Sequence, residues 1–238
     1  MKLKYSVVIP LKDEEDNVEI LISEIEPVME SIGEDWEMIC IDDGSTDRTR
    51  SILEELAETK SFLKPLFFDK NYGQSSAFDA GFKKAVGEYI ITLDGDLQND
   101  PKDIPKLIAK ADNADMVCGC RLNRKDTFTK KITSKLANKV RGKICRDNMK
   151  DTGCSLKLYR KSCLEKIKLF DGMHRFLPAL FKNEGFLVIE VPVNHRHRQH
   201  GNSKYNFLNR SFNTIADMLA VRWMRKRRLK YKIKQETL

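Results

Sequence analysis

Short apolar runs alternate with amphipathic segments through the first 120 residues, and this alternation constrains the fold more than any other feature. The apolar runs are rich in Val, Ile and Phe, which predicts buried strands. Between them, apolar residues recur every three or four positions, which predicts helices. Predicted strands cover residues 4–9, 36–41, 62–68, 88–93 and 115–120, and predicted helices cover 15–32, 47–56, 75–86 and 101–111. This order is typical of a mainly parallel sheet covered by helices on both faces, so we predict an α/β fold.

Several element boundaries carry local signals. Pro10 is expected to stop the first strand, because proline cannot donate to a ladder. Ser45 or Thr46 is a natural N-cap for the second helix, and Gly87 a natural C′ residue after the third. Pro101 lies where the fourth helix is expected to begin.

The second half of the chain is less regular. Helices are expected over residues 130–145 and 174–182, and strands over 155–159 and 187–193. Pro192 favours an edge position for the last of these strands. We expect a main domain over residues 1–203, whose second half completes the sheet and forms one wall of a site, and an extension over residues 204–238.

Acidic clusters follow three of the predicted strands. They are Lys12-Asp13-Glu14, Asp42-Asp43 and Asp94-Gly95-Asp96. Open parallel sheets bind ligands beyond the carboxyl ends of their strands, where these clusters are expected to meet. Acids gathered at one edge repel one another, so a cation or a polar ligand is expected between them.

Asp94 and Asp96 are the most specific of these acids. Residues two apart in an extended chain point to the same side, so the two carboxylates form a pair. An all-oxygen site suits a hard cation such as Mg²⁺ or Mn²⁺, and Gln98 could add an amide oxygen. The alternative is an ordinary turn, because Asp-Gly is a frequent turn dipeptide.

Composition excludes several classes of protein. Hydrophobic residues make up 41% and charged residues 33%, which is typical of a globular chain and not of a disordered one. No apolar run is long enough to span a membrane, and the N-terminus lacks the pattern of a signal peptide, which predicts a cytoplasmic protein. The six cysteines show no Cys-x-x-Cys spacing, so buried thiols are expected and zinc is not.

The net charge of +8 is concentrated at the C-terminus. Residues 222–238 contain eight basic residues and one acid, so the rest of the chain is nearly neutral. An apolar stripe precedes this run, formed by Leu208, Phe212, Ile215, Leu219 and Trp223. Such a stripe either packs on the core or lies on an anionic membrane. No recognition motif for nucleic acid accompanies the basic residues, so a nucleic-acid partner is not expected.

Five motifs in order resemble one enzyme family. They are Val8-Ile9-Pro10, Asp13-Glu14, Ile41-Asp42-Asp43-Gly44-Ser45-Thr46-Asp47, Leu93-Asp94-Gly95-Asp96-Leu97-Gln98 and Arg198-Gln199-His200-Gly201-Asn202-Ser203-Lys204. Together they resemble glycosyltransferase family 2, which has the GT-A (Rossmann-like) fold, and within it the polyprenyl-phosphate sugar transferases. The resemblance implies an inverting transfer from a UDP- or GDP-linked sugar to a polyprenyl phosphate of the dolichyl or undecaprenyl type, with Mg²⁺ or Mn²⁺ as the cofactor.

The resemblance also implies residue roles. The metal would be held by Asp94, Asp96 and Gln98, and the catalytic set would be Asp94, Asp96, Asp151 and Arg198. The donor would be bound by Pro10, Lys12, Glu14, Ile41, Asp43, Leu93, Gly95, Arg121, Lys130, Ser134 and Lys204. Many relatives have an aromatic residue where this chain has Lys12, so aromatic packing on the nucleoside is not expected.

The resemblance predicts a location and leaves two alternatives. An enzyme that modifies a membrane lipid would act peripherally at the inner, cytoplasmic face, held by an anionic membrane surface or a membrane partner protein. A phosphate acceptor is already ionised at neutral pH, so no strong general base is required and Asp151 could orient the sugar instead. The first alternative is a transferase for a saccharide acceptor, and the second is a non-catalytic nucleotide-binding membrane adaptor.

Overall fold

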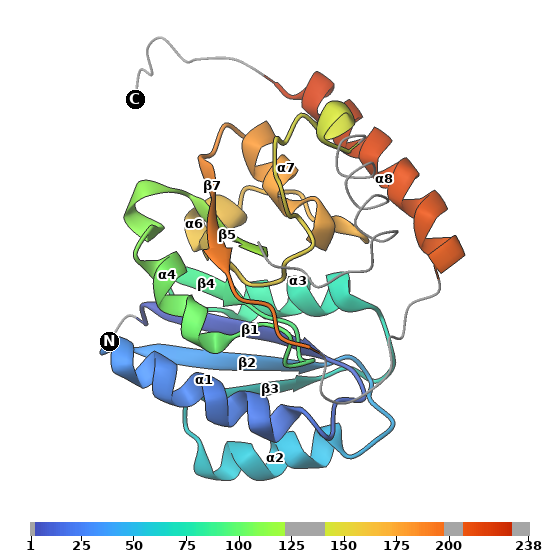
Figure 1. Ribbon diagram of the computed structural model, residues 1–238. Helices are drawn as coiled ribbons and strands as arrows, with labels where there is room; N and C mark the ends of the chain where they lie inside the picture. The colour runs from blue at the N-terminus through green and yellow to red at the C-terminus, as the bar shows by residue number, and fades with distance from the viewer. Residues whose placement is uncertain (1–2, 122–140, 198–206, 230–238) are drawn as a thin grey trace, which may run out of the picture.

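The computed structural model describes residues 3–121, 141–197 and 207–229, which form a seven-stranded sheet flanked by helices (Figure 1). The strand order is β3-β2-β1-β4-β6-β5-β7. The strands are β1 (Tyr5–Leu11), β2 (Trp36–Asp42), β3 (Leu63–Phe67), β4 (Tyr89–Thr92), β5 (Met116–Arg121), β6 (Lys157–Arg160) and β7 (Val188–Val193). The strand β6 is antiparallel to both of its neighbours and all other pairs are parallel, which confirms the predicted mainly parallel sheet.

Helices cover both faces of the sheet. One face carries α1 (Val18–Ile32), α2 (Thr49–Thr59) and α4 (Ile104–Ile108). The other carries α3 (Gln74–Lys84), α6 (Lys161–Leu164), α7 (Leu177–Asn183) and α8 (Phe207–Arg227). Side chains alternate between the two cores along β1, since Val7 and Ile9 face the first and Val8 faces the second.

The order of the strands places a crevice between β1 and β4. The chain runs from β1 outward to β2 and β3, then returns through α3 to pair β4 with the opposite side of β1. This reversal makes a topological switch point, where the loops leaving two adjacent strands diverge. Both loops carry predicted acidic clusters, so the fold brings them together.

Two expected boundaries at the start of the chain were wrong. Strand β1 continues through Pro10 to Leu11, because pairing with β4 stops at Val8 and the missing N–H of Pro10 interrupts no ladder there. Helix α2 begins at Thr49, later than a cap at Ser45 or Thr46 would place it. The Asp47 carboxylate accepts the Thr49 N–H instead, at 2.9 Å.

Two other helix boundaries differ from those expected from the sequence, for steric and hydrogen-bonding reasons. Helix α3 ends with Ala85 as its C-cap, while Gly87 passes so close to β1 that a Cβ there would lie 2.6 Å from the carbonyl carbon of Tyr5. The helix expected over residues 101–111 is divided into η1 (Pro101–Asp103), α4 and η2 (Ala111–Asn113). Pro105 lacks an N–H and fits only a first helical turn, so a new helix starts there.

The second half completes the sheet as expected. Strands β6 and β7 lie beyond β4, and β7 is an edge strand. The helix predicted over residues 174–182 consists of η3 (Met173–Arg175) followed by α7. Residues 141–145 are helical, and the rest of the helix predicted over 130–145 lies outside the described residues.

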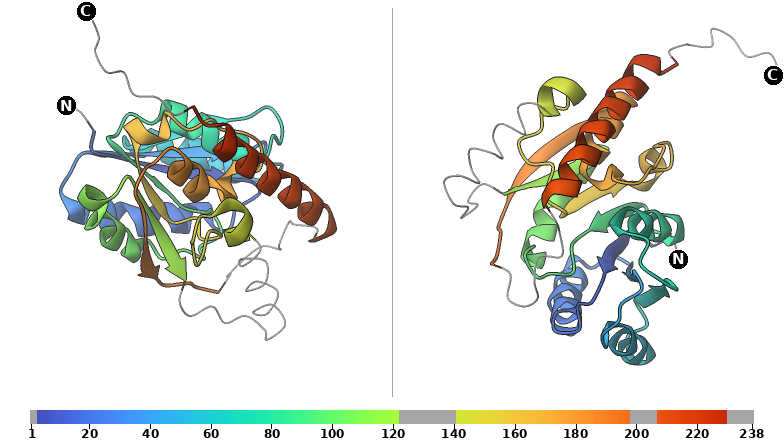
Figure 2. Two further views of the ribbon diagram at one scale, coloured as in Figure 1. Left: turned by 90° about the horizontal axis from the view of Figure 1, so that it is seen from above. Right: turned by 90° about the vertical axis from the view of Figure 1, so that its right-hand side faces the viewer.

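Helix α8 runs along the outside of the molecule beside α7 (Figure 2). Met218 and Val221 face the body of the protein and belong to its second core. In the described part of the chain, no helix combines the length and the apolar character needed to cross a membrane.

Candidate active site

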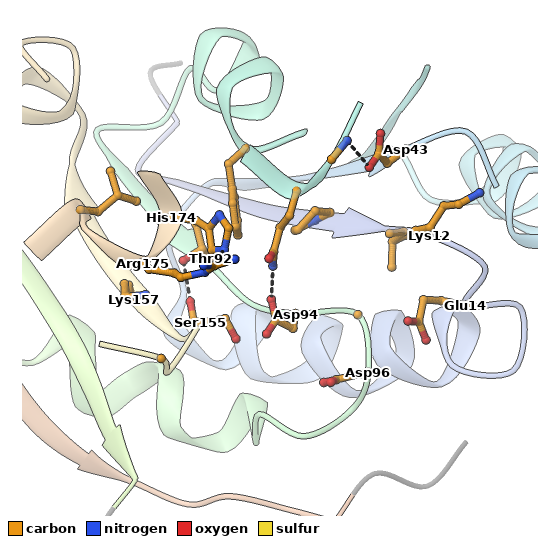
Figure 3. A pocket seen from close by; sticks show the side chains of 18 of the residues that line it. Lys12, Glu14, Asp43, Thr92, Asp94, Asp96, Ser155, Lys157, His174 and Arg175 are labelled. Atoms are coloured by element: carbon orange, nitrogen blue, oxygen red, sulfur yellow. Dashed lines mark hydrogen bonds between the residues drawn. The ribbon is translucent and has the colours of Figure 1, made fainter. Parts of the chain in front are cut away.

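A cavity of about 570 Å³ opens at the switch point between β1 and β4 (Figure 3). Its walls come from the ends of these strands, the start of α3, the segment 152–159 and the η3–α7 region. The predicted site residues that line it are Pro10, Lys12, Glu14, Asp43, Asp94, Gly95 and Asp96. Three acidic clusters that are distant in sequence therefore contribute to one cavity or its rim.

Lys12 and Asp43 shape one end of the cavity. The Nζ of Lys12 donates to the carbonyl oxygen of Gly44 at 2.5 Å and to Asp13 Oδ1 at 3.3 Å. Asp43 accepts the backbone N–H groups of Tyr72 at 2.6 Å and Gly73 at 2.9 Å, which fixes the turn that starts α3. Burial raises the pKa of the Asp43 carboxyl, although these two N–H groups act in the opposite direction.

Asp94 and Asp96 form an acidic pair at the centre of the cavity. Asp94 Oδ1 accepts a hydrogen bond from Gln74 Nε2 at 2.8 Å, and Asp96 Oδ1 accepts the Gln98 N–H at 3.2 Å. Burial raises the pKa of Asp94, and the neighbouring charge of Asp96 raises it further. Two acidic side chains thus line one cavity, and a bound cation would relieve the repulsion between them.

The chemistry of this pair fits a hard divalent ion. Its ligands are carboxylate oxygens, which Mg²⁺ and Mn²⁺ prefer. Over the described ranges, no group of three or more His, Cys, Asp or Glu side chains is assembled to hold a metal, so a bound ligand would have to supply further oxygens. Gln98 lies outside the cavity lining, and its backbone oxygen accepts the Arg196 N–H at 2.9 Å.

Arg121 and Asp151 are joined behind one wall of the cavity. The guanidinium donates to both carboxylate oxygens, with Nε at 2.7 Å and Nη2 at 2.9 Å. Asp151 also accepts the Gly153 N–H at 3.1 Å, so its charge is already paired. The arrangement suits a residue that holds the wall formed by Thr152 and Gly153 better than one that accepts a proton.

A buried arginine, Arg141, supports the same wall of the cavity. Arg141 donates to Asp147 at 3.0 Å, to the Met149 carbonyl oxygen at 2.8 Å and to the hydroxyl of Thr152. Its guanidinium thus joins three points of the loop that leads to β6 and fixes the position of that loop against the cavity.

The remaining predicted residues lie in three situations. Ile41 and Leu93 are fully buried core residues beneath the cavity. Lys130, Ser134, Arg198 and Lys204 lie outside the described residues. Arg196, which precedes Arg198 in the chain, is paired with Glu24 at 2.6 Å and Asp100 at 2.7 Å.

None of the predicted site residues lies at the opposite end of the cavity. Thr92, Lys157, Tyr159, His174 and Arg175 line it. They come from β4, β6 and η3, whose pairing is set by tertiary contacts and has no local signature. One available signal was a lysine, Lys157, between the apolar residues Leu156 and Leu158 of a predicted strand.

The fold and the site define a class of protein in which an open α/β sheet carries a cavity lined by acidic side chains at its switch point. Residues 6–168 match the model of the family described as Glycosyl transferase family 2, and the chain belongs to that family.

All six cysteines are free and buried, as predicted.

Two curated relatives share most of the chain. It is 40% identical over 225 residues to the dodecaprenyl-phosphate galacturonate synthase of Rhizobium johnstonii, covering 92% of this chain and 66% of that protein. It is 38% identical over 218 residues to the undecaprenyl-phosphate 4-deoxy-4-formamido-L-arabinose transferase of Enterobacter sp. (strain 638), covering 91% and 66%. The chain thus spans slightly less than two thirds of the length of each relative.

Solved structures confirm the GT-A type of fold. The glucosyl-3-phosphoglycerate synthase of Mycobacterium tuberculosis, in complex with Mn²⁺, UDP and phosphoglyceric acid, superposes with a TM-score of 0.67. The two chains are 17% identical, and the match covers 94% of this chain and 78% of the other. At this identity the likeness concerns the fold alone.

Proposed function

We propose that this protein transfers a sugar from a nucleotide-sugar donor to a polyprenyl phosphate, with inversion at the sugar carbon. The observation that carries the proposal is the pair of Asp94 and Asp96, which faces a cavity at the switch point of a family 2 domain. Both curated relatives are named for transfer to a polyprenyl phosphate, and the solved neighbour was crystallised with UDP and Mn²⁺.

The reaction forms one bond and breaks one. An oxygen of the acceptor phosphate bonds to the sugar carbon C1, the bond from C1 to the diphosphate breaks, and the electron pair leaves with the nucleoside diphosphate. Asp94 and Asp96 would hold Mg²⁺ or Mn²⁺, which supplies Lewis-acid neutralisation of the departing diphosphate. The acceptor phosphate is ionised at neutral pH, so the protein is not required to remove a proton.

This chain's own residues divide into binding and positioning roles. Lys12, Glu14 and Asp43 line the end of the cavity proposed for the nucleoside. Asp43 fixes the turn before α3, from which Gln74 reaches Asp94. Asp151 holds Arg121 and the adjoining wall, and we propose a positioning role for it in place of general-base catalysis.

A donor panel tests the function. Purified protein is incubated with radiolabelled UDP- and GDP-sugars, with polyprenyl phosphate or saccharide acceptors, and with or without EDTA. We expect label in the lipid fraction only with polyprenyl phosphate and a divalent ion. Transfer to saccharides alone would move the acceptor to the alternative class, and binding of nucleotide without transfer or hydrolysis would indicate an adaptor.

Arg198 provides a test of the acceptor side. We propose that it contacts the acceptor phosphate, and loss of a charge-assisted hydrogen bond costs roughly 1.5–3 kcal/mol. Arg198→Ala is therefore expected to lower kcat/KM for the acceptor about tenfold to a hundredfold, with a smaller effect on slow donor hydrolysis. Equal losses in both reactions would assign Arg198 to the donor.

We further propose that the protein acts peripherally at the cytoplasmic face of a membrane. Ile215, Leu219 and Trp223 are 51%, 55% and 63% exposed on α8, so these members of the predicted apolar stripe face away from the core. Arg222 and Lys226 are exposed on the same helix. Apolar and basic side chains presented together favour an anionic lipid surface.

A further inference from the structure

Lys157 is a buried lysine that the proposed chemistry leaves without a role. It begins β6, where its backbone pairs with Thr92 of β4 and Cys118 of β5. Its side chain lines the cavity, yet the residue is only 4% exposed. Over the described ranges of the chain, its Nζ makes no hydrogen bond and no ion pair with another side chain or with a backbone oxygen.

The other cationic side chains around the cavity all have partners. Lys12 binds the Gly44 oxygen, and Arg175 binds Thr214 Oγ1 at 2.9 Å. Arg121, behind the wall, is paired with Asp151. The charge of Lys157 acts to lower the pKa of Asp94, but over the described residues no oxygen accepts a hydrogen bond from its ammonium. Burying an ammonium without a hydrogen-bond acceptor is costly, so Lys157 is the residue among these that a bound oxyanion would satisfy.

The groups next to Lys157 are committed elsewhere. The Thr92 hydroxyl donates to the Ser155 carbonyl oxygen at 2.7 Å. Arg175 Nε can only donate, so Nε2 of His174, at 3.2 Å, is an acceptor. The proton of the neutral imidazole then lies on Nδ1 and is donated to Ser75 Oγ at 2.9 Å. Both nitrogens of His174 are therefore used within the wall of the cavity.

The cavity is divided by charge along its length. In Figure 3, Lys12, Glu14 and Asp43 lie at one end, Asp94 lies between, and Lys157, His174 and Arg175 lie at the other end. A donor whose nucleoside occupies the first end and whose diphosphate lies at the acidic pair directs its sugar toward the second end. The acceptor must approach this same region to reach the sugar carbon C1.

We propose that the Lys157 end of the cavity is a subsite for an oxyanion other than the donor diphosphate. Two groups carry the required chemistry: a carboxylate on the transferred sugar, as in a uronic acid, and the phosphate of the acceptor. Either would place an anionic oxygen against the ammonium of Lys157, a residue that is almost fully buried. The inference rests on the proposed function, and it identifies Lys157 as a determinant of which substrate is bound.

Binding measurements with matched probes test this subsite without requiring turnover. The sugar arm compares UDP-glucuronate and UDP-galacturonate with UDP-glucose and UDP-galactose, which lack the carboxylate. The acceptor arm compares a water-soluble short-chain prenyl phosphate with the corresponding prenyl alcohol. Titration calorimetry is performed on the unmodified full chain, Lys157→Met, Lys157→Arg and the control Lys168→Met, which changes an exposed lysine.

In the arm whose probe uses the subsite, we expect Lys157→Met to weaken binding of the charged probe about tenfold to a hundredfold and to leave binding of the neutral probe unchanged. Lys157→Arg should restore part of the loss, because the positive charge is kept, and Lys168→Met should change nothing. The arm that responds identifies the source of the oxyanion. Thermal unfolding of each variant verifies that the fold is intact.

Two results would overturn the subsite. One is unmodified protein that binds neither charged probe better than its neutral counterpart. The other is a Lys157→Met variant that weakens charged and neutral probes equally, which is the behaviour of a residue that only supports the wall. Sugar transfer by the unmodified protein is measured separately, so the proposed function can stand when the subsite fails, and the subsite can stand when transfer is absent.

Discussion

Buried acids at the amino ends and at the carboxyl ends of the strands have opposite surroundings. Glu37 lies at the amino end of β2 and is 1% exposed. Its carboxylate accepts from the Ser6 hydroxyl at 2.6 Å, Lys64 Nζ at 2.6 Å and the Val86 N–H at 2.8 Å. Burial alone would raise the pKa of Glu37, but these partners outweigh it, and the pKa is lowered.

At the carboxyl end of β4, the balance for Asp94 is the opposite. Gln74 donates a hydrogen bond to it. Burial and the charge of Asp96 raise its pKa, and they outweigh the groups that act to lower it, which are Ser155, Lys157 and Arg121. The comparison separates two uses of a buried carboxylate. Glu37 is held by three donors of the chain and supports the fold, whereas Asp94 and Asp96 line the cavity, where we propose that they hold a divalent cation.

The largest expected effect is on the acidic pair. Asp96→Ala should lower transfer about a hundredfold to a thousandfold or more, because Lewis-acid stabilisation of a leaving group contributes several kcal/mol. Asp94→Asn should be nearly as severe. The unfolding temperature should stay the same or rise in both variants, because each removes charge repulsion from a partly buried site. Initial rates at saturating metal and thermal scans measure the two effects.

Removal of the metal provides the matching control. EDTA should abolish transfer by the unmodified protein, and added Mg²⁺ or Mn²⁺ should restore it. Full turnover in EDTA would contradict a metal-dependent reaction. A large fall in the unfolding temperature of Asp96→Ala would make this acid a structural residue like Glu37.

Glu37→Gln should give the reverse pattern. Replacing a buried, charge-assisted acceptor should cost about 1–3 kcal/mol of unfolding free energy, because the partners Ser6, Lys64 and Val86 lose their anionic acceptor. Activity per folded molecule should be unchanged, since Glu37 lies at the amino ends of the strands and the cavity lies at their carboxyl ends. Urea unfolding and initial rates on the same preparation test both statements.

The sign of the pH dependence can be stated for the loss of unfolding free energy in Glu37→Gln. Because the pKa of Glu37 is lowered on folding, its contribution is complete above the ordinary pKa of glutamate and is lost as the pH falls through the lowered pKa. The stability difference between unmodified protein and Glu37→Gln should therefore shrink in acid. A difference that stays constant down to about pH 3 would show that the pKa of Glu37 is not lowered on folding, and a difference that grows in acid would show that the carboxyl is protonated in the folded protein.

The same comparison shows what sequence could predict. Strands, helices and the acidic clusters have local signals, namely apolar runs, spacings of three and four, and acids that follow a strand, so these were found. The partners that separate Glu37 from Asp94 are tens of residues away in sequence, and no local pattern encodes them. Lys157 was missed for the same reason, since only the insertion of β6 between β4 and β5 brings it to the cavity.

Helix α8 repeats the contrast on a smaller scale, with one face complete and the other exposed. Val221 is fully buried and Trp223 is 63% exposed. Val221→Ala should cost about 1.5 kcal/mol of stability for two lost methylene equivalents and leave vesicle binding per folded molecule unchanged. Trp223→Gln should leave unfolding within about 0.5 kcal/mol of the unmodified protein and weaken binding to anionic vesicles.

Co-sedimentation with neutral and anionic vesicles at low and high salt tests the exposed face. Each basic residue near an anionic surface contributes about 1 kcal/mol, and a reversal changes the charge by two, so Arg222→Glu and Lys226→Glu should each weaken binding about thirtyfold at low salt and less at high salt. Both side chains are exposed, so neither reversal should disturb the core. Binding that ignores lipid charge and salt, or that persists undiminished in Trp223→Gln, would exclude this face of α8 as the contact with the membrane.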